Sequence, residues 1–419
     1  MSATASPAPS DDQTSGKQTS GDQTSDDQTS GDRPRGGLVA LCITQTTSWG
    51  VLFYSLPAAL TPIAEDTGWS HTAITGALSL GLAVSAIAGI RVGRILDRRG
   101  PRTVMTLGGI VGVIALLLIA WSPSLWAFYG AWLVAGFAQA AIFYPPAFTV
   151  ITRWYGTRRV RPLLVLTLVA GFSSTIFAPL TAFLVQQLGW RASYLVLAGI
   201  LAAVTVPLHA IFLNTRWTDT PDARSEADAA TSRETVRAVA RSPRFLALQL
   251  AMMLATFTLF AVTINLIQLL LERGVAYATA ALAFGLVGAG QAIGRLGYPR
   301  VERATTPAVR MAAILGAGAL GLWAVAVIPG PAWALVVLAI LIGAARGAHT
   351  LLQATAVSDR WGTRNFGTLN GIFAAPMTAV TALAPVSGPV LAGLLGGYPA
   401  MALAMAGLLT AAALLSLRT

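Results

Sequence analysis

The chain has 419 residues, of which 55% are hydrophobic and only 11% are charged. Soluble domains carry about 25% charged residues, so this composition indicates an integral membrane protein. The net charge of +11 would suit a nucleic-acid-binding protein, but the arginines lie in the gaps between apolar runs. We therefore exclude nucleic acid as a partner and expect a lipid bilayer instead.

The N-terminal segment, residues 1–35, contains a polar repeat, DQTSG-KQTSG-DQTSD-DQTSG. Such a composition cannot bury apolar surface, so we expect a disordered cytoplasmic tail. The apolar run that follows lacks a small-residue cleavage site, and we expect it to be retained as the first span.

Twelve apolar runs follow, each long enough to cross a bilayer as a helix. They predict an all-α membrane protein with two six-helix bundles, residues 36–213 and 245–419, joined by a linker at 214–244. The predicted spans are 38–62, 71–95, 103–121, 125–152, 161–187, 192–213, 245–271, 276–298, 308–328, 332–357, 367–394 and 398–417.

Basic residues cluster in alternate gaps between the spans, and the opposite gaps carry almost none, only Arg191 and Arg273. Because cytoplasmic loops are enriched in lysine and arginine, we expect both termini and the linker to be cytoplasmic in a multi-pass protein of the cell membrane. The cluster after the second span, Arg94, Arg98, Arg99 and Arg102, serves as a topological anchor, and further basic residues at and beyond the end of the eighth span are Arg295, Arg300, Arg303 and Arg310. Within the linker, Thr231 and Glu234 form a capping-box pattern, which predicts a short surface helix or a solvated linker.

The two predicted bundles resemble each other at a nearly constant offset. GIRVGR at 89–94 matches GQAIGR at 290–295, and Gly136 falls on Gly343. The order and steady spacing of these matches predict two bundles related by a pseudo-two-fold axis along the membrane normal. In such folds the ligand lies near the bilayer midplane between the halves.

The segment GRILDRRGPR resembles the signature loop of the major facilitator superfamily. Its motif positions are filled by Gly93, Asp97, Arg98, Gly100 and Arg102. The resemblance covers residues 36–418 and extends, through SWGVLFYSLPAAL and STIFAPLTAFLVQQLGWR, to the bacterial branch similar to monocarboxylate transporters. It implies a secondary transporter in which this loop gates the cytoplasmic side.

Three positions depart from patterns found in that superfamily. Tyr298 stands where the second half would repeat the acid at Asp97. Trp132 stands where many proton-coupled members carry arginine, and APLTAF keeps Pro179 without the glycines of drug antiporters. The last two departures count against a proton/drug antiporter without excluding one.

One full charge, Arg346, lies near the middle of the tenth span, and no acid lies in mid-span. A mid-bilayer arginine costs about 2.5–3.5 kcal/mol even on the insertion scale, so it needs an anion or dense hydrogen bonding. An anionic substrate would supply the anion, whereas backbone carbonyls freed by neighbouring prolines and glycines would supply the hydrogen bonds. His349 shares the helix face of Arg346, as a proton-handling or simply packed residue, and the repeat places Gln139 opposite in the fourth span.

Further substrate-binding candidates are polar residues within spans, each of which could equally be a hydrogen bonder between helices. They are Tyr144, Asn265 and Gln268.

The sequence contains no metal-ligand cluster and no phosphate-binding loop, so we expect no enzyme, metal or cofactor. The preferred interpretation is a monomeric secondary transporter that moves a small organic anion, such as a monocarboxylate, by alternating access, with the proton as candidate coupling ion. Two alternatives stay open: an efflux carrier for amphipathic drugs or metabolites, and, more remotely, a non-transporting receptor on the same fold.

Overall fold

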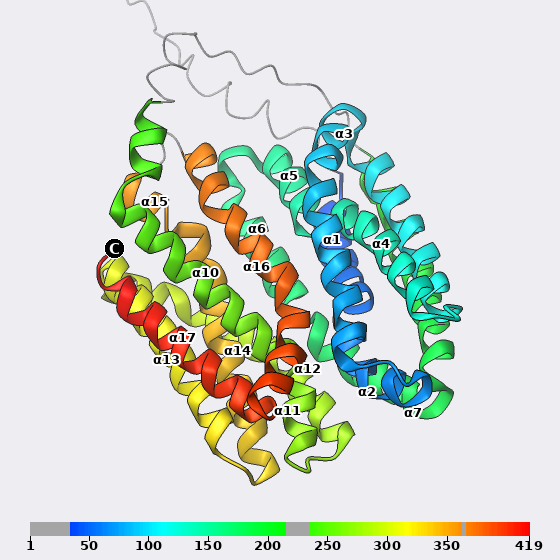
Figure 1. Cartoon of the computed structure of the whole chain (residues 1–419). Coiled ribbons are helices and arrows are strands. Elements are labelled where there is room, and N and C mark those ends of the chain that lie inside the picture. The colour runs from blue at the N-terminus through cyan, green and yellow to red at the C-terminus, as the bar shows by residue number, and fades with distance from the viewer. Residues whose placement is uncertain (1–33, 215–233, 363–365) are drawn as a thin grey trace, which may run out of the picture.

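The computed structural model describes residues 34–214, 234–362 and 366–419, and these are almost entirely helical (Figure 1). Eleven helical stretches of the described residues are long and apolar enough to cross a membrane. One of them, Arg161–Phe212, has 52 residues and contains a break at Gly189, where φ is 76° and ψ is 164°. It covers the two predicted spans 161–187 and 192–213. The all-α membrane fold is therefore confirmed.

The N-terminal half is built from helices that are often interrupted within one crossing. Its elements are α1 (Gly37–Trp49), η2 (Gly50–Tyr54), α2 (Ser55–Thr67), α3 (His71–Ala120), α4 (Leu125–Ile142), α5 (Tyr144–Tyr155), η3 (Gly156–Arg158), α6 (Val160–Ala170), α7 (Ser173–Ile200), η4 (Leu201–Thr205) and α8 (Val206–Phe212). The long α3 holds two predicted spans, because Gly100 adopts a φ of 77° just before Pro101 and reverses the chain.

The C-terminal half repeats this plan. Its elements are α10 (Pro243–Ile264), α11 (Leu266–Glu272), α12 (Tyr277–Ala304), α13 (Pro307–Val327), α14 (Ala332–Thr355), α15 (Ser358–Trp361), α16 (Phe366–Leu395) and α17 (Tyr398–Ser416). Before α10, residues 234–240 are helical, whereas most of the predicted linker and nearly all of the predicted polar tail lie outside the described residues.

Several predicted spans are divided in the structure, although the sequence pattern predicts one continuous helix. The predicted span 245–271 divides at Asn265, which ends α10 and precedes α11. The predicted span 125–152 divides at Phe143, whose extended backbone precedes the pair Pro145 and Pro146. Proline cannot continue the hydrogen-bond ladder of a preceding helix, so the second break follows from sequence. The first has no such signal.

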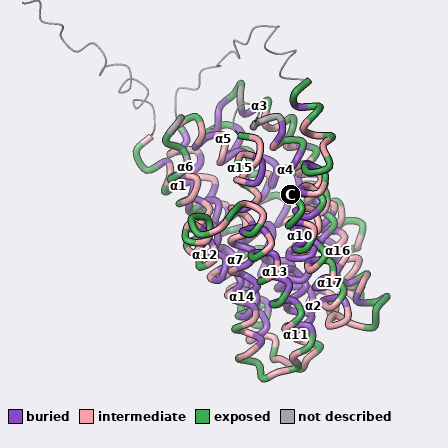
Figure 2. Tube along the Cα trace, turned by 90° about the vertical axis from the view of Figure 1, so that its left-hand side faces the viewer, coloured by how far each residue is buried: buried purple, intermediate pink, exposed green. Residues whose placement is uncertain are grey.

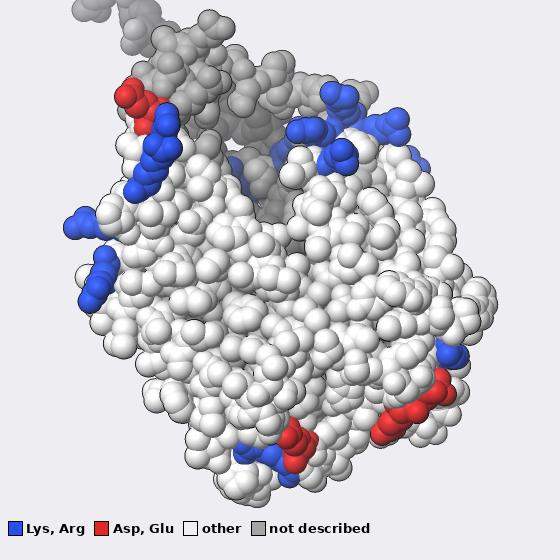
Figure 3. All heavy atoms as spheres, in the orientation of Figure 1, with Lys and Arg blue, Asp and Glu red and all other residues white. Residues whose placement is uncertain are grey.

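The two halves lie side by side and present an apolar outer surface. Buried residues run through the interior, and exposed residues cover the outside (Figure 2). Large apolar side chains such as Leu320 and Leu394 are among the exposed ones. The broad middle of the molecule carries no visible charge, and charged side chains gather toward its two ends (Figure 3). This surface suits a protein surrounded by lipid.

We call the end that carries the α3 reversal at Gly100 the basic end, and the opposite end the far end. The halves are joined at the far end. Thr61 of α2 and Gln268 of α11 exchange hydrogen bonds of 3.0 and 3.2 Å, and the Tyr277 hydroxyl donates to the Ala58 carbonyl.

Candidate functional site

Two arginine side chains are buried at the centre of the molecule, where the halves meet. Arg295 of α12 is 5% exposed and Arg346 of α14 is 3% exposed. They are close enough to interact electrostatically with each other. The helices can approach closely because Gly290 and Gly294 of α12 face the backbone of α14 without a side chain between them. Small residues at such contacts are typical of helix packing in membranes.

Arg346 lies among aromatic side chains. Its guanidinium carbon is 3.9 Å from the centre of the Phe260 ring, on α10 of the same half. Tyr54 of η2, in the opposite half, and Tyr144 of α5 both interact with it electrostatically. Its Nη1 atom, although buried, has no hydrogen-bond partner among the described residues.

Arg295 reaches across to the N-terminal half. Its Nη1 donates to the Thr167 carbonyl near the C-terminal end of α6, and its Nε donates to Thr350 over 3.3 Å. Gly171, which follows α6, leaves room for this guanidinium, since a Cβ there would lie 2.7 Å from Arg295 Nη1. The C-terminal end of a helix carries partial negative charge, which favours a cation at this place.

Two of the basic residues at and beyond the end of the predicted eighth span are buried. The helix α12 continues to Ala304, so Arg295 lies well inside it. Arg310 is 4% exposed and forms an ion pair with Asp359. The carboxylate of Asp359 offsets the electrostatic cost of burying the Arg310 guanidinium.

Neither Arg295 nor Arg346 forms an ion pair with any described residue; the pairs between described residues join Arg191 to Asp66 and Arg310 to Asp359. Other donors near the two arginines also lack an acceptor. Nε2 of Gln291 is buried and unpaired one turn before Arg295, and so is Nε1 of Trp49, whose ring lies 5.0 Å from that of Tyr144. A region rich in unpaired donors and positive charge is complementary to an anion.

The remaining predicted binding residues do not form one group. His349 is buried beside α10, with Nε2 3.5 Å from the Thr256 hydroxyl. Gln139 is fully buried and donates to the Leu52 carbonyl over 2.9 Å, which ties α4 to η2 within the N-terminal half. Asn265 packs against Gly388 of α16, and Gln268 joins the halves at the far end. Tyr144 and His349 are the candidates that interact electrostatically with Arg346.

The predicted gating motif lies at the basic end, on the reversal inside α3. Arg98 and Arg102 are exposed, and Gly100 supplies the positive φ of the turn. Gly93 faces open space, because a Cβ there would meet nothing within 4 Å. The side chain of Asp97 lies outside the described part of the structure, so its proposed contact stays a prediction.

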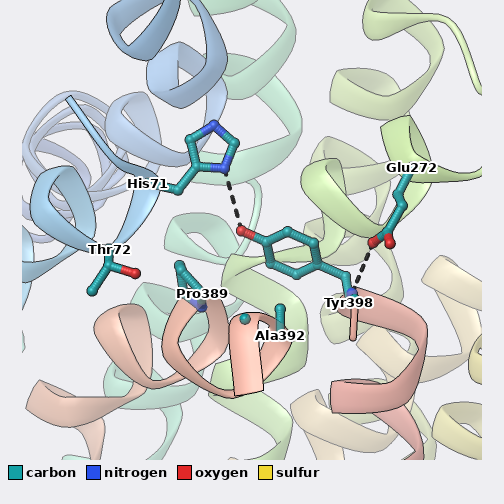
Figure 4. A pocket seen from close by; sticks show the side chains of 8 residues that line it. His71, Thr72, Glu272, Pro389, Ala392 and Tyr398 are labelled. Atoms are coloured by element: carbon teal, nitrogen blue, oxygen red, sulfur yellow. Dashed lines mark hydrogen bonds between the residues drawn. The ribbon is translucent and has the colours of Figure 1, made fainter. Parts of the chain in front are cut away.

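A separate cavity of about 380 Å³ opens at the far end between the halves. His71 approaches the Tyr398 hydroxyl to 3.4 Å across it, and Glu272 accepts a hydrogen bond of 2.7 Å from the Tyr398 backbone (Figure 4). The Glu272 carboxylate thereby caps the N-terminus of α17. This cavity contains an acid, unlike the central cluster.

Residues 41–377 match the family model described as Major Facilitator Superfamily. The chain belongs to this superfamily. Its members are membrane transporters, not enzymes, and the relatives agree. The chain is 29% identical to human monocarboxylate transporter 11 over 67% of its length and 58% of the human protein. It is 26% identical to the MFS-type transporter YcxA of Bacillus subtilis, over 35% of this chain and 36% of that protein.

Solved structures confirm the fold. A transporter of the POT family has a TM-score of 0.71 at 14% identity, with 91% of this chain and 95% of that chain covered. A bacterial homologue of the human lysosomal transporter Spinster has a TM-score of 0.68 at 16% identity, with 92% and 93% covered. The match to the human monocarboxylate transporter spans little more than half of that protein's length, so substrate and activity have to be argued from the site.

Proposed function

We propose that this protein is a secondary transporter that moves a small organic anion, a monocarboxylate, across the cell membrane by alternating access. The observation that carries the proposal is Arg346, which is buried between the two halves with no carboxylate partner and a free Nη1. A guanidinium binds a carboxylate through parallel, charge-assisted hydrogen bonds. The substrate supplies the counter-anion that the chain itself lacks at this place.

Three features support the assignment of the substrate's charge. Arg295 adds a second buried cation, so the cluster has net positive charge without a ligand. Gln291 and Trp49 add unpaired donors and no unpaired acceptor of their own. Several relatives are themselves named as monocarboxylate transporters. A cationic drug would meet repulsion here, which argues against the efflux alternative.

The arrangement of the halves supports alternating access. The Thr61–Gln268 and Tyr277–Ala58 contacts hold the halves together at the far end, so we infer that this state gives access from the basic end. We assign the basic end to the cytoplasm, because cytoplasmic loops are enriched in arginine. Opening toward the other side requires loss of the Thr61–Gln268 contact and approach of the two halves at the basic end.

The test is flux into proteoliposomes that contain the full-length protein. Radiolabelled pyruvate should enter and saturate, unlabelled acetate should compete, and Arg346→Gln should lower uptake about a hundred-fold, since truncating a buried charge contact costs several kcal/mol. Arg303→Gln, which removes an exposed charge at the end of α12, is the matched control and should transport normally. Imposing a pH gradient tests the proton as coupling ion. Uptake of ethidium without any carboxylate flux would overturn the proposal in favour of the efflux carrier.

A further inference from the structure

We infer that the carried anion has an aromatic or comparably broad apolar body, so that aryl carboxylates are preferred over short-chain acids. This inference rests on the proposed function and concerns the part of the substrate that Arg346 does not bind. It follows from the side chains that surround the free guanidinium atom, which are mostly aromatic rings contributed by both halves.

The rings form a continuous group around Arg346. Phe260 lies directly beneath the guanidinium, and Tyr54 approaches it from the opposite half. Tyr54 in turn meets Phe284 of α12 edge to face, at 5.8 Å between ring centres. Tyr144 also interacts with Arg346, and it stacks on Phe148 at 5.1 Å. A carboxylate bound to Arg346 therefore places its carbon body against ring faces and edges.

Several of these rings are not fully covered by protein. Phe260 and Tyr144 are half-buried, although both adjoin an arginine that is almost fully buried between the halves. Trp49, which adjoins Tyr144, is half-buried too, and its Nε1 lacks an acceptor. Apolar surface that stays open beside an unpaired cation is surface that a ligand can cover.

The chemistry of the group favours a broad, flat ligand over a small one. Aromatic pairs gain from offset-stacked and edge-to-face geometry in addition to the area they bury. Acetate or lactate would satisfy Arg346 and leave the rings uncovered. An aryl carboxylate satisfies the same donors and also covers the rings, and its added carbon atoms leave water for an apolar wall.

The experiment measures binding to the purified full-length protein with three probes. Phenylpyruvate and pyruvate share the same charged group and differ in the phenyl ring, and phenylacetamide keeps the ring without the charge. We expect phenylpyruvate to bind at least about ten-fold more tightly than pyruvate, given the typical value of added apolar contact in a pocket. Phenylacetamide should bind more weakly than either acid.

The outcomes separate this inference from the proposed function. Equal or tighter binding of pyruvate would overturn the aromatic preference and leave anion transport standing. Binding of neither acid would reject both. Tighter binding of phenylacetamide than of phenylpyruvate would show an apolar site without an anion requirement and would also reject both.

Two variants locate the preference in the ring group. Phe260→Leu and Phe148→Leu should each lower the ratio of phenylpyruvate to pyruvate affinity several-fold. Phe137→Leu removes a ring from the outer face of α4, where Phe137 is 50% exposed, and is the matched control. If Phe137→Leu lowers the ratio as much as Phe260→Leu, the rings around Arg346 do not set the preference.

Discussion

The two halves of the molecule carry the same glycine–arginine motif and use it differently. In the N-terminal half, Gly93 faces open space and Arg94 is exposed at the basic end. In the C-terminal half, Gly294 presses against the Ala344 backbone, and Arg295 is buried against the end of α6. Related sequence thus provides a surface anchor in one half and part of the central cluster in the other.

The same division holds for the second matched pair. Gln139 is bonded within its own half, whereas Arg346, its repeat partner, is buried with a free donor between the halves. The C-terminal half therefore supplies the central cations, and the N-terminal half supplies Tyr54, Tyr144 and Trp49 to face them. Pseudo-symmetry fixes where helices lie, and substitution at matched positions decides which half holds the ligand's charge.

The largest expected effect comes from making the two halves alike at the matched pair. Arg346→Gln gives the C-terminal half the residue that stands at 139, and it should weaken carboxylate binding about a hundred-fold by removing the buried charge contact. Isothermal titration with the full-length protein measures this. Arg346→Lys keeps the charge but lacks the planar guanidinium, so its affinity for the carboxylate should lie between those of the unchanged protein and Arg346→Gln.

The contrast between the two halves would be contradicted if variants at 139 and 346 weakened ligand binding equally. Gln139→Leu removes the hydrogen bond to Leu52 and should lower stability with little effect on ligand affinity once the protein is folded. A similar loss of affinity in both variants would mean that the N-terminal half contributes to ligand binding at this position after all.

The second effect concerns helix packing at the matched glycines Gly89 and Gly290. A Cβ at Gly290 would overlap the Ile340 carbonyl, whereas one at Gly89 would meet nothing within 4 Å. Gly290→Ala should therefore destabilise the protein by about 1–3 kcal/mol, the usual cost of overpacking. Gly89→Ala should be neutral or slightly stabilising, since alanine favours helix. Thermal unfolding in detergent distinguishes them, and equal melting temperatures would contradict the close approach of α12 to α14.

The sequence predicts much of this fold because lipid restricts it. Apolar runs of about twenty residues and alternating arginine clusters locate the spans, and Gly189 and Gly100 fall in the predicted gaps. The break at Asn265 could not be predicted, because no proline or glycine marks it and the residue lies in an apolar run. In the structure Asn265 packs against Gly388 of α16, a contact that only the folded protein brings about.

Only part of the candidate site could be predicted from the sequence, for a similar reason. Arg346 is evident as a lone charge within an apolar run, but Arg295 lies near a predicted span end, next to the basic residues Arg300 and Arg303. The length of α12 decides its burial, and helix ends are the least certain feature of a sequence-based prediction. The one available signal was its match to Arg94, which points to the wrong environment. Contacts between halves, such as Gln268 with Thr61, have no signal in either helix alone.

The third prediction concerns the hydrogen bond between Arg295 and the Thr167 carbonyl of the N-terminal half. Gly171→Ala would place a Cβ 2.7 Å from Arg295 Nη1, and the flexible guanidinium should move off the end of α6 while the backbone stays in place. Because Arg295 then no longer binds a carbonyl, we expect carboxylate affinity to rise about three-fold, within the range of a charged hydrogen bond. Titration of pyruvate measures it. Gly199→Ala, on an open face of α7, is the control. Unchanged affinity in both variants would show that the Thr167 carbonyl does not compete with the ligand for Arg295.

The smallest effect is expected at the far end, where the two halves meet through neutral groups. Tyr398→Phe removes the hydroxyl that approaches His71 at 3.4 Å, a long hydrogen bond, so the far end should open about two- to five-fold more often, corresponding to about 0.5–1 kcal/mol. Thiol labelling of Thr72→Cys, in a background with Cys42→Ser, reports that opening. Tyr298→Phe removes a 2.9 Å hydrogen bond to Thr355 that stays within one half, so it should leave labelling unchanged. If both variants raise labelling equally, the change reflects general loosening, and the contact between His71 and Tyr398 does not hold the halves together.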